Sequence, residues 1–145
     1  MIKLRTIELL TKCSYKLGGI SIYDQGIDCF GLVLEYLRIE KNIIIKPYHN
    51  NVNYRIYSSL YNRYQYEVMT SFGDFLSNVL LEIPVEKSFI GDIIICSDSI
   101  GYSAMIMVGN GNVLAAVENI GVGFVSINSY IKKRAFRWDQ VKVAY

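Results

Sequence analysis

The spacing of apolar residues changes once along the chain, near Ile90, and this change constrains the fold more than any other feature. Before it, apolar residues recur at intervals of three and four, which is the period of amphipathic helices. After it, short apolar runs are separated by Gly and Asn turns, which is the pattern of an antiparallel sheet. The sequence therefore predicts an α+β fold, with residues 1–85 mainly helical and residues 86–145 mainly a β meander.

Four helices are expected in the first half. One ends at Gly18 and Gly19, because glycine commonly follows the last turn of a helix. Another begins at Cys29, because the residues after it follow the helical period and Asp28 can cap the free amides at its N-terminus. The expected helices cover residues 4–17, 29–41, 54–64 and 75–80.

Five strands are expected in the second half, and the tract "VGNGNV" between the second and third predicts a tight hairpin. The expected strands are "GDIIIC" (91–96), "YSAMIMV" (102–108), "NVLAAV" (112–117), "GVGFVSI" (121–127) and "AFRWDQVKVAY" (135–145). The helices are therefore expected to pack on an antiparallel sheet formed by the C-terminal half.

Length and charge limit the classes of protein to consider. The 145 residues suit one domain, 1–145, with one core. The net charge of +2 comes from 15 basic and 13 acidic residues spread along the chain, so no strong field for nucleic acid is expected. The densest basic cluster is expected to be a solvated strand edge. It comprises Lys132, Lys133, Arg134 and Arg137.

No targeting segment, membrane span or bound ion is expected. The start, "MIKLRTIELLTKC", lacks the apolar core and cleavage site of a secretory signal, and no stretch reaches the roughly 18 apolar residues of a membrane span. The three cysteines are odd in number and widely spaced, which argues against a disulfide framework. One histidine and scattered carboxylates give no metal-ligand cluster, so neither a metal nor a cofactor is expected.

Cys29 allows two interpretations. A thiolate at a helix N-terminus is favoured by the helix dipole, and the unpaired amides there can form an oxyanion hole for acyl transfer. Free cysteine is also among the most buried residue types, so a Cys at the head of an apolar helix can be a packing residue. The residue pattern leaves both interpretations open.

Four tracts together resemble the NlpC-type cell-wall cysteine peptidases, which have a papain-like fold. They are "YKLGG" (15–19), "GIDCFG" (26–31), "GDIIIC" (91–96) and "SAMIMVGNGNVLAA" (103–116). The resemblance implies that Cys29 stands at the nucleophile position, where it would attack a peptide bond of a peptidoglycan stem. It also places Tyr15 where the family has a tyrosine near the cysteine, although Tyr15 can equally be a packing residue at the end of the first helix.

The same alignment shows where the chain departs from the family. The position of the family's general-base histidine falls on Ser103, and that of its second histidine falls on Ala115. A serine hydroxyl is no general base near neutral pH, and an alanine side chain cannot orient anything, so hydrolysis by the family mechanism is not expected. The single histidine, His49, is expected in a loop, and whether it approaches Cys29 stays open.

Strand parity tests this alignment. A two-residue turn at Asn110 and Gly111 would put positions 103 and 115 on opposite faces of the sheet, whereas a three-residue loop starting at Gly109 would put them on one face. The family geometry requires one face.

The resemblance extends to the short forms carried by bacteriophages and gene transfer agents. It implies a tail-tip or hub component made in the host cytoplasm and located in the virion tail. The leading hypothesis is a degenerate peptidase fold that binds other tail proteins. Its interface would use a tyrosine stripe flanked by Arg55 and Arg63, since Tyr and Arg are enriched in interfaces. The stripe is Tyr54, Tyr57, Tyr61 and Tyr64, and a half-buried helix face is the other interpretation of it.

Two alternatives belong to other classes. The chain can be an active peptidase or acyltransferase that uses Cys29 with an unusual base. It can also be a module that binds peptidoglycan without cleaving it.

Overall fold

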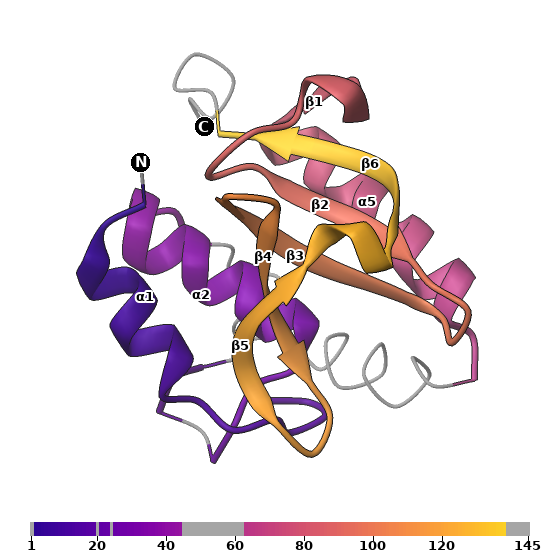
Figure 1. The fold of residues 1–145 in the computed structure, drawn as a ribbon. Coiled ribbons are helices and arrows are strands. Elements are labelled where there is room, and N and C mark those ends of the chain that lie inside the picture. Colours follow the sequence, from indigo (N-terminus) through magenta and orange to yellow (C-terminus); the bar gives the residue numbers. More distant parts are fainter. Residues whose placement is uncertain (1, 20, 24, 45–62, 139–145) are drawn as a thin grey trace.

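The computed structural model describes residues 2–19, 21–23, 25–44 and 63–138, and it has the expected α+β architecture (Figure 1). Among these residues, three α-helices pack on a six-stranded antiparallel sheet. The helices are α1 (Leu4–Thr11), α2 (Cys29–Lys41) and α5 (Gln65–Val79). The strands are β1 (Leu81–Ile83), β2 (Ile93–Ser97), β3 (Tyr102–Gly109), β4 (Asn112–Val117), β5 (Gly121–Ser126) and β6 (Ile131–Arg137); short 3-10 helices η1 (Val85–Lys87) and η2 (Ile127–Ser129) follow β1 and β5.

The strand order in the sheet is β1-β6-β2-β3-β4-β5. Strands β2 to β5 form the expected meander, in which each strand pairs with the next. Strand β6 then returns to the free side of β2 and also pairs with β1. Strand β1, which lies in the half expected to be helical, was not predicted. The last strand begins at Ile131, four residues before its expected start.

Two apolar clusters lie on the two faces of the sheet. The larger joins α2 and α5 to one face, where the rings of Phe30 and Phe72 meet edge to face with centroids 4.8 Å apart. The smaller lies on the opposite face, around Cys96, Met105 and Ala115, and residues from η1 and η2 pack against it. The α-helices therefore cover only one face, and residues of η1 and η2 cover part of the other.

Two of the expected helices differ from those observed. The helix expected over 4–17 ends at Thr11, because Ser14 and Lys16 form backbone hydrogen bonds with Ile27 and Tyr15 forms an isolated bridge with the same residue. The helix expected over 75–80 begins much earlier, at Gln65. By contrast, α2 has the expected bounds, 29–41.

The basic cluster of β6 is not the expected solvated edge. Strand β6 lies inside the sheet, between β1 and β2. Arg134 forms ion pairs with Asp74 and Glu82, and Arg137 forms a bidentate pair with the buried Asp92. The two arginines therefore tie β6 to α5, β1 and the start of β2.

The hairpin between β3 and β4 has a two-residue turn, but its strands have the parity that was expected only of a three-residue loop. Its turn has two residues, Asn110 and Gly111, and both have positive φ (54° and 72°), as a type I′ turn requires. The register also shifts by one residue between Met107 and Gly109, which is a β-bulge. The bulge reverses the parity that a two-residue turn alone would give.

Candidate functional site

Asp28 holds the N-terminus of α2 in place and so positions Cys29. Its buried carboxylate accepts hydrogen bonds from the amide of Gly31 and from the amide of Gly18, both at 2.9 Å. The first bond is an N-cap, and the second ties the preceding loop to the helix. Asp28 therefore fixes the helix start against the segment that contains Tyr15.

Gly19 brings this loop close to the strand-like segment before α2. An added Cβ at Gly19 would lie 1.9 Å from the carbonyl oxygen of Gly26, so no larger residue fits without a backbone shift. The glycine pair in "YKLGG", which suggested a helix stop, instead permits this close approach. The loop and the helix start form one packed unit.

Tyr15 lies near Cys29 and Asp28. Burial raises the pKa of Tyr15 to about 12, and the nearby Cys29, Asp28 and Glu118 add to this effect by disfavouring a phenolate. The phenol therefore stays neutral at physiological pH and can both donate and accept a hydrogen bond. The Cys29 side chain itself is buried, with 4% of its surface exposed.

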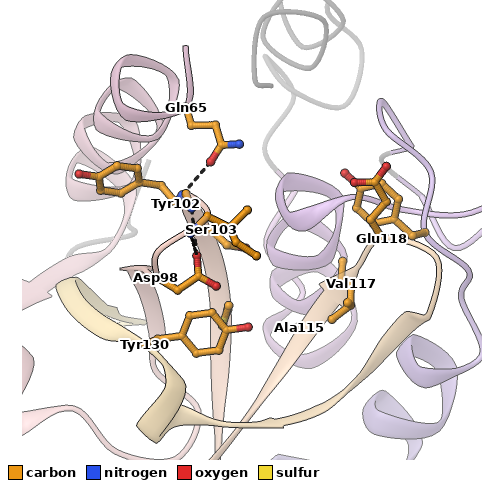
Figure 2. A pocket seen from close by; sticks show the side chains of 13 residues that line it. Gln65, Asp98, Tyr102, Ser103, Ala115, Val117, Glu118 and Tyr130 are labelled. Atoms are coloured by element: carbon orange, nitrogen blue, oxygen red, sulfur yellow. Dashed lines mark hydrogen bonds between the residues drawn. The ribbon is translucent and has the colours of Figure 1, made fainter. Parts of the chain in front are cut away.

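A groove of about 360 Å³ lies beside these residues (Figure 2). It opens where β3 and β4 separate: their pairing extends from the turn to Ile106 and Leu114. Beyond that point Ser103 and Ala115 lie on the two walls. The lining residues are Tyr15, Gln65, Asp98, Ile100, Gly101, Tyr102, Ser103, Met105, Ala115, Ala116, Val117, Glu118 and Tyr130.

Ser103 and Ala115 share one face of the sheet. Met107 pairs with Val113 beyond the bulge, and counting by two along each strand from this pair reaches Ser103 and Ala115. The two positions therefore share one face, although a two-residue turn was expected to put them on opposite faces.

The wall formed by β2, β3 and α5 carries polar side chains that are held in place by hydrogen bonds to backbone amides. The side-chain oxygen of Gln65 accepts a hydrogen bond from the Tyr102 amide at 2.8 Å, which fixes the first turn of α5 to β3 (Figure 2). Asp98 accepts bonds from the amides of Ile100 and Gly101, which shape the turn between β2 and β3. Burial, and less strongly Asp98, raises the pKa of Tyr130, whose ring points toward Ala115 (Figure 2).

Of the residues that the structure describes, those that line the groove include no imidazole and no Lys or Arg. Its ionisable groups are the carboxylates of Asp98 and Glu118 and the phenols of its three tyrosines. Such a lining can hold a ligand through hydrogen bonds and can attract positive charge, but it contains no group of the kind that activates a thiol near neutral pH.

The two other thiols differ in exposure. Cys96 is fully buried in β2, and burial raises its pKa to about 12, with smaller effects from Cys29 and Asp98. Cys13 is partly exposed, and burial raises its pKa to a smaller extent, followed by the effect of Glu35. Neither environment favours a thiolate at neutral pH.

The structure thus brings together Tyr15, Asp28 and Cys29, and it places Ser103 and Ala115 in the groove beside Tyr15. Tyr64 precedes α5 and is 42% exposed. The other members of the proposed stripe, Tyr54, Tyr57 and Tyr61, and also Arg55 and His49, lie outside the described residues.

Of the thirteen lining residues, only Tyr15, Ser103 and Ala115 were predicted as site residues; the others include the polar residues Gln65, Asp98, Glu118 and Tyr130. A signal existed for two of them. The tracts "DSIG" (98–101) and "ENIG" (118–121) follow β2 and β4, and alternate turns of an antiparallel meander lie at the same end of the sheet. Gln65 and Tyr130 reach the groove only through the packing of distant elements.

Within residues 2–19, 21–23, 25–44 and 63–138, no group of three or more potential ligands could hold a metal ion. No helix in these ranges has the length and apolar character needed to cross a bilayer.

Comparison with known proteins supports the fold. No protein-family model and no curated protein matches the chain. Among solved structures, the chain is similar to the NlpC/p60 domain of the peptidoglycan hydrolase SagA, with 16% sequence identity and a TM-score of 0.57. The match covers 91% of this chain and 92% of that domain. The chain therefore has the fold of an NlpC/p60, papain-like domain.

Proposed function

We propose that the chain is a non-hydrolysing binding component of a phage-like tail tip or hub, built on the NlpC/p60 fold. The observation that carries the proposal is the composition of the groove. Its two walls bear Ser103 and Ala115 where the resemblance places the two histidines of the family, and its lining has no imidazole within the described part of the chain. The groove and its supports, the Asp28 cap and the Gln65 bond, are nevertheless intact.

General-base assistance typically contributes about 10²- to 10⁴-fold to a rate, and loss of one member of a catalytic set disables the others. Cys29 is buried, and the described residues of the groove include no imidazole, which supports binding over hydrolysis. The exposed Tyr64, beside which Arg63 lies 5.4 Å from the ring centroid, agrees with an aromatic and cationic contact surface near α5.

The test is complex formation. The purified chain is mixed with each protein encoded next to it, and complexes are measured by size-exclusion chromatography with light scattering. We expect a stable complex with at least one of these proteins. A monomer with no affinity for any of them contradicts the proposed role.

A parallel experiment separates the alternatives. Co-sedimentation with purified cell walls, without complex formation, would assign the chain to the class of peptidoglycan-binding modules. Release of stem peptides from the same walls would assign it to the cysteine peptidases.

A further inference from the structure

Two hairpin tips flank the groove, and each presents a carboxylate and an exposed isoleucine. On one wall these are Asp98 and Ile100, in the turn between β2 and β3. On the other they are Glu118 and Ile120, in the turn between β4 and β5. Ile100 is 88% exposed and Ile120 is 80% exposed. Both tips lie at the same end of the meander; Ile100 itself lines the groove, and Ile120 lies two residues from the lining residue Glu118.

Each wall also pairs its carboxylate with a phenol. Glu118 lies close enough to Tyr15 to contribute to its raised pKa, and Asp98 does the same for Tyr130. Tyrosine rings and carboxylates both attract an organic cation, and the attraction grows when the cation leaves water. Among the described residues that line the groove there is no Lys or Arg, so none of them neutralises the two carboxylates.

We propose that the groove binds a Lys or Arg side chain of a partner protein, carried on an extended segment with apolar residues on both sides. The cation would lie between the Tyr15–Glu118 wall and the Tyr130–Asp98 wall. The flanking apolar residues would cover Ile100 and Ile120, and burial of these two side chains would add to the affinity. This inference rests on the proposed function, because it assigns the groove to binding.

The probe is an acetylated, amidated pentapeptide, Gly-Leu-Lys-Leu-Gly, compared with the same peptide carrying Gln or Glu at the centre. Binding is followed by amide chemical shifts of the isotope-labelled protein. We expect the Lys peptide to shift the amides of Gly101, Ser103 and Ala116 saturably, and to bind at least about tenfold more tightly than the Glu peptide.

Three double variants locate the effect. Asp98→Asn with Glu118→Gln removes both groove carboxylates and should weaken the Lys peptide about tenfold, to the level of the Gln peptide. Glu8→Gln with Glu86→Gln removes two exposed carboxylates outside the groove lining and should change nothing. Ile100→Ser with Ile120→Ser should weaken all three peptides alike.

Equal affinity for the three peptides, or shifts at residues away from the groove, overturns the inference. A stronger response to a soluble stem peptide than to the Lys peptide also overturns it. If the complex with a neighbouring protein still forms in these cases, the proposed function stands and only the assignment of the groove fails. If stem peptides are cleaved, the proposed function itself fails.

Discussion

Asp28 and Cys29 are adjacent residues, and the first fixes the position of the second. Asp28 satisfies two backbone amides, one in the helix and one in the loop, so its role is structural whether or not Cys29 reacts. Cys29 is held at the helix start by that cap and by core packing. Its position is therefore no evidence of reactivity.

Alkylation rates test the state of the thiols. In the folded protein we expect iodoacetamide to modify Cys13 first, because it is partly exposed, whereas Cys29 and Cys96 are 4% and 0% exposed. Because the pKa of Cys13 is raised above 9.0, its rate should still be rising at pH 9. Mass spectrometry of peptides after timed quenching measures the order. Modification of Cys29 before Cys13 at neutral pH would support the cysteine-peptidase alternative.

The environment of Tyr15 predicts how stability depends on pH. Its folded-state pKa of about 12 lies above the ordinary value of 10, so between pH 10 and 12 the unfolded chain loses this proton while the folded chain keeps it. Stability should therefore fall as pH rises through this window. In Tyr15→Phe the fall should be less steep, because this contribution is absent. Urea unfolding at pH 9, 10 and 11 measures the slopes, and parallel curves would contradict the assignment.

At the scale of elements, local signals explain what could be predicted. The bounds of α2 followed from a cap and a regular period, and the meander followed from short strands with turn residues between them. The end of α1 could not be predicted, because the residues after Thr11 form backbone bonds with Ile27, far along the chain. The start of β6 was missed for a similar reason, since its pairing with β2 and β1 is non-local.

The groove was predictable only in part. The resemblance identified Ser103 and Ala115, but the bulge that places them on one face leaves no clear sign in "VGNGNV". Gln65 reaches β3 across 37 positions of sequence, and no pattern near Gln65 indicates that contact.

The cap of α2 has a measurable energetic role. Asp28→Ala removes both acceptors and leaves the Gly18 and Gly31 amides without this partner, so we expect a loss of about 2 kcal/mol in unfolding free energy. Asp28→Asn keeps one oxygen acceptor and should lose less. Chemical denaturation measures both variants. A loss for Asp28→Ala below about 0.5 kcal/mol, the range of surface substitutions, would contradict the role of the cap.

Gly19 and Gly123 form a matched pair of tests. Gly19→Ala places a methyl group against the Gly26 carbonyl and should destabilise the protein by at least about 2 kcal/mol, whereas at Gly123 an added Cβ meets nothing within 4 Å. Neither glycine has a φ in the left-handed region, so the comparison isolates the steric effect. Thermal and urea unfolding give the difference. Equal losses of unfolding free energy in the two variants would contradict the steric role of Gly19, because they would show that the loop before α2 shifts at little cost.

At the scale of the whole molecule, Arg134 joins the β half to the helical half through its ion pair with Asp74 of α5, and Arg137 forms a second pair within the β half. Arg137 pairs with Asp92, which is 2% exposed, and its guanidinium lies 3.9 Å from the centre of the Phe89 ring. The two ends of the sheet thus differ. At one end Arg137 pairs with Asp92, and at the other β3 and β4 separate and leave the groove open. The groove at this open end is the part of the molecule to which the proposed function assigns a partner.

Removal of Arg137 tests how much its ion pair with Asp92 contributes to stability. Arg137→Met leaves the buried Asp92 carboxylate without its cation, and we expect a loss of about 3 kcal/mol. Lys133→Met removes an exposed charge from the same strand and should change stability by less than about 0.5 kcal/mol. Denaturation curves for the two variants and the parent protein provide the measurement. Similar small losses in both would show that the Arg137 pair contributes little.

The most direct test of the central claim is incubation of the purified chain with isolated cell walls, followed by mass spectrometry of the released peptides. We predict no release above that of a buffer control, and no difference between the parent protein and Cys29→Ala. If the parent protein releases stem peptides and Cys29→Ala does not, the claim is contradicted, because the Cys29 thiol would then be shown to cleave them.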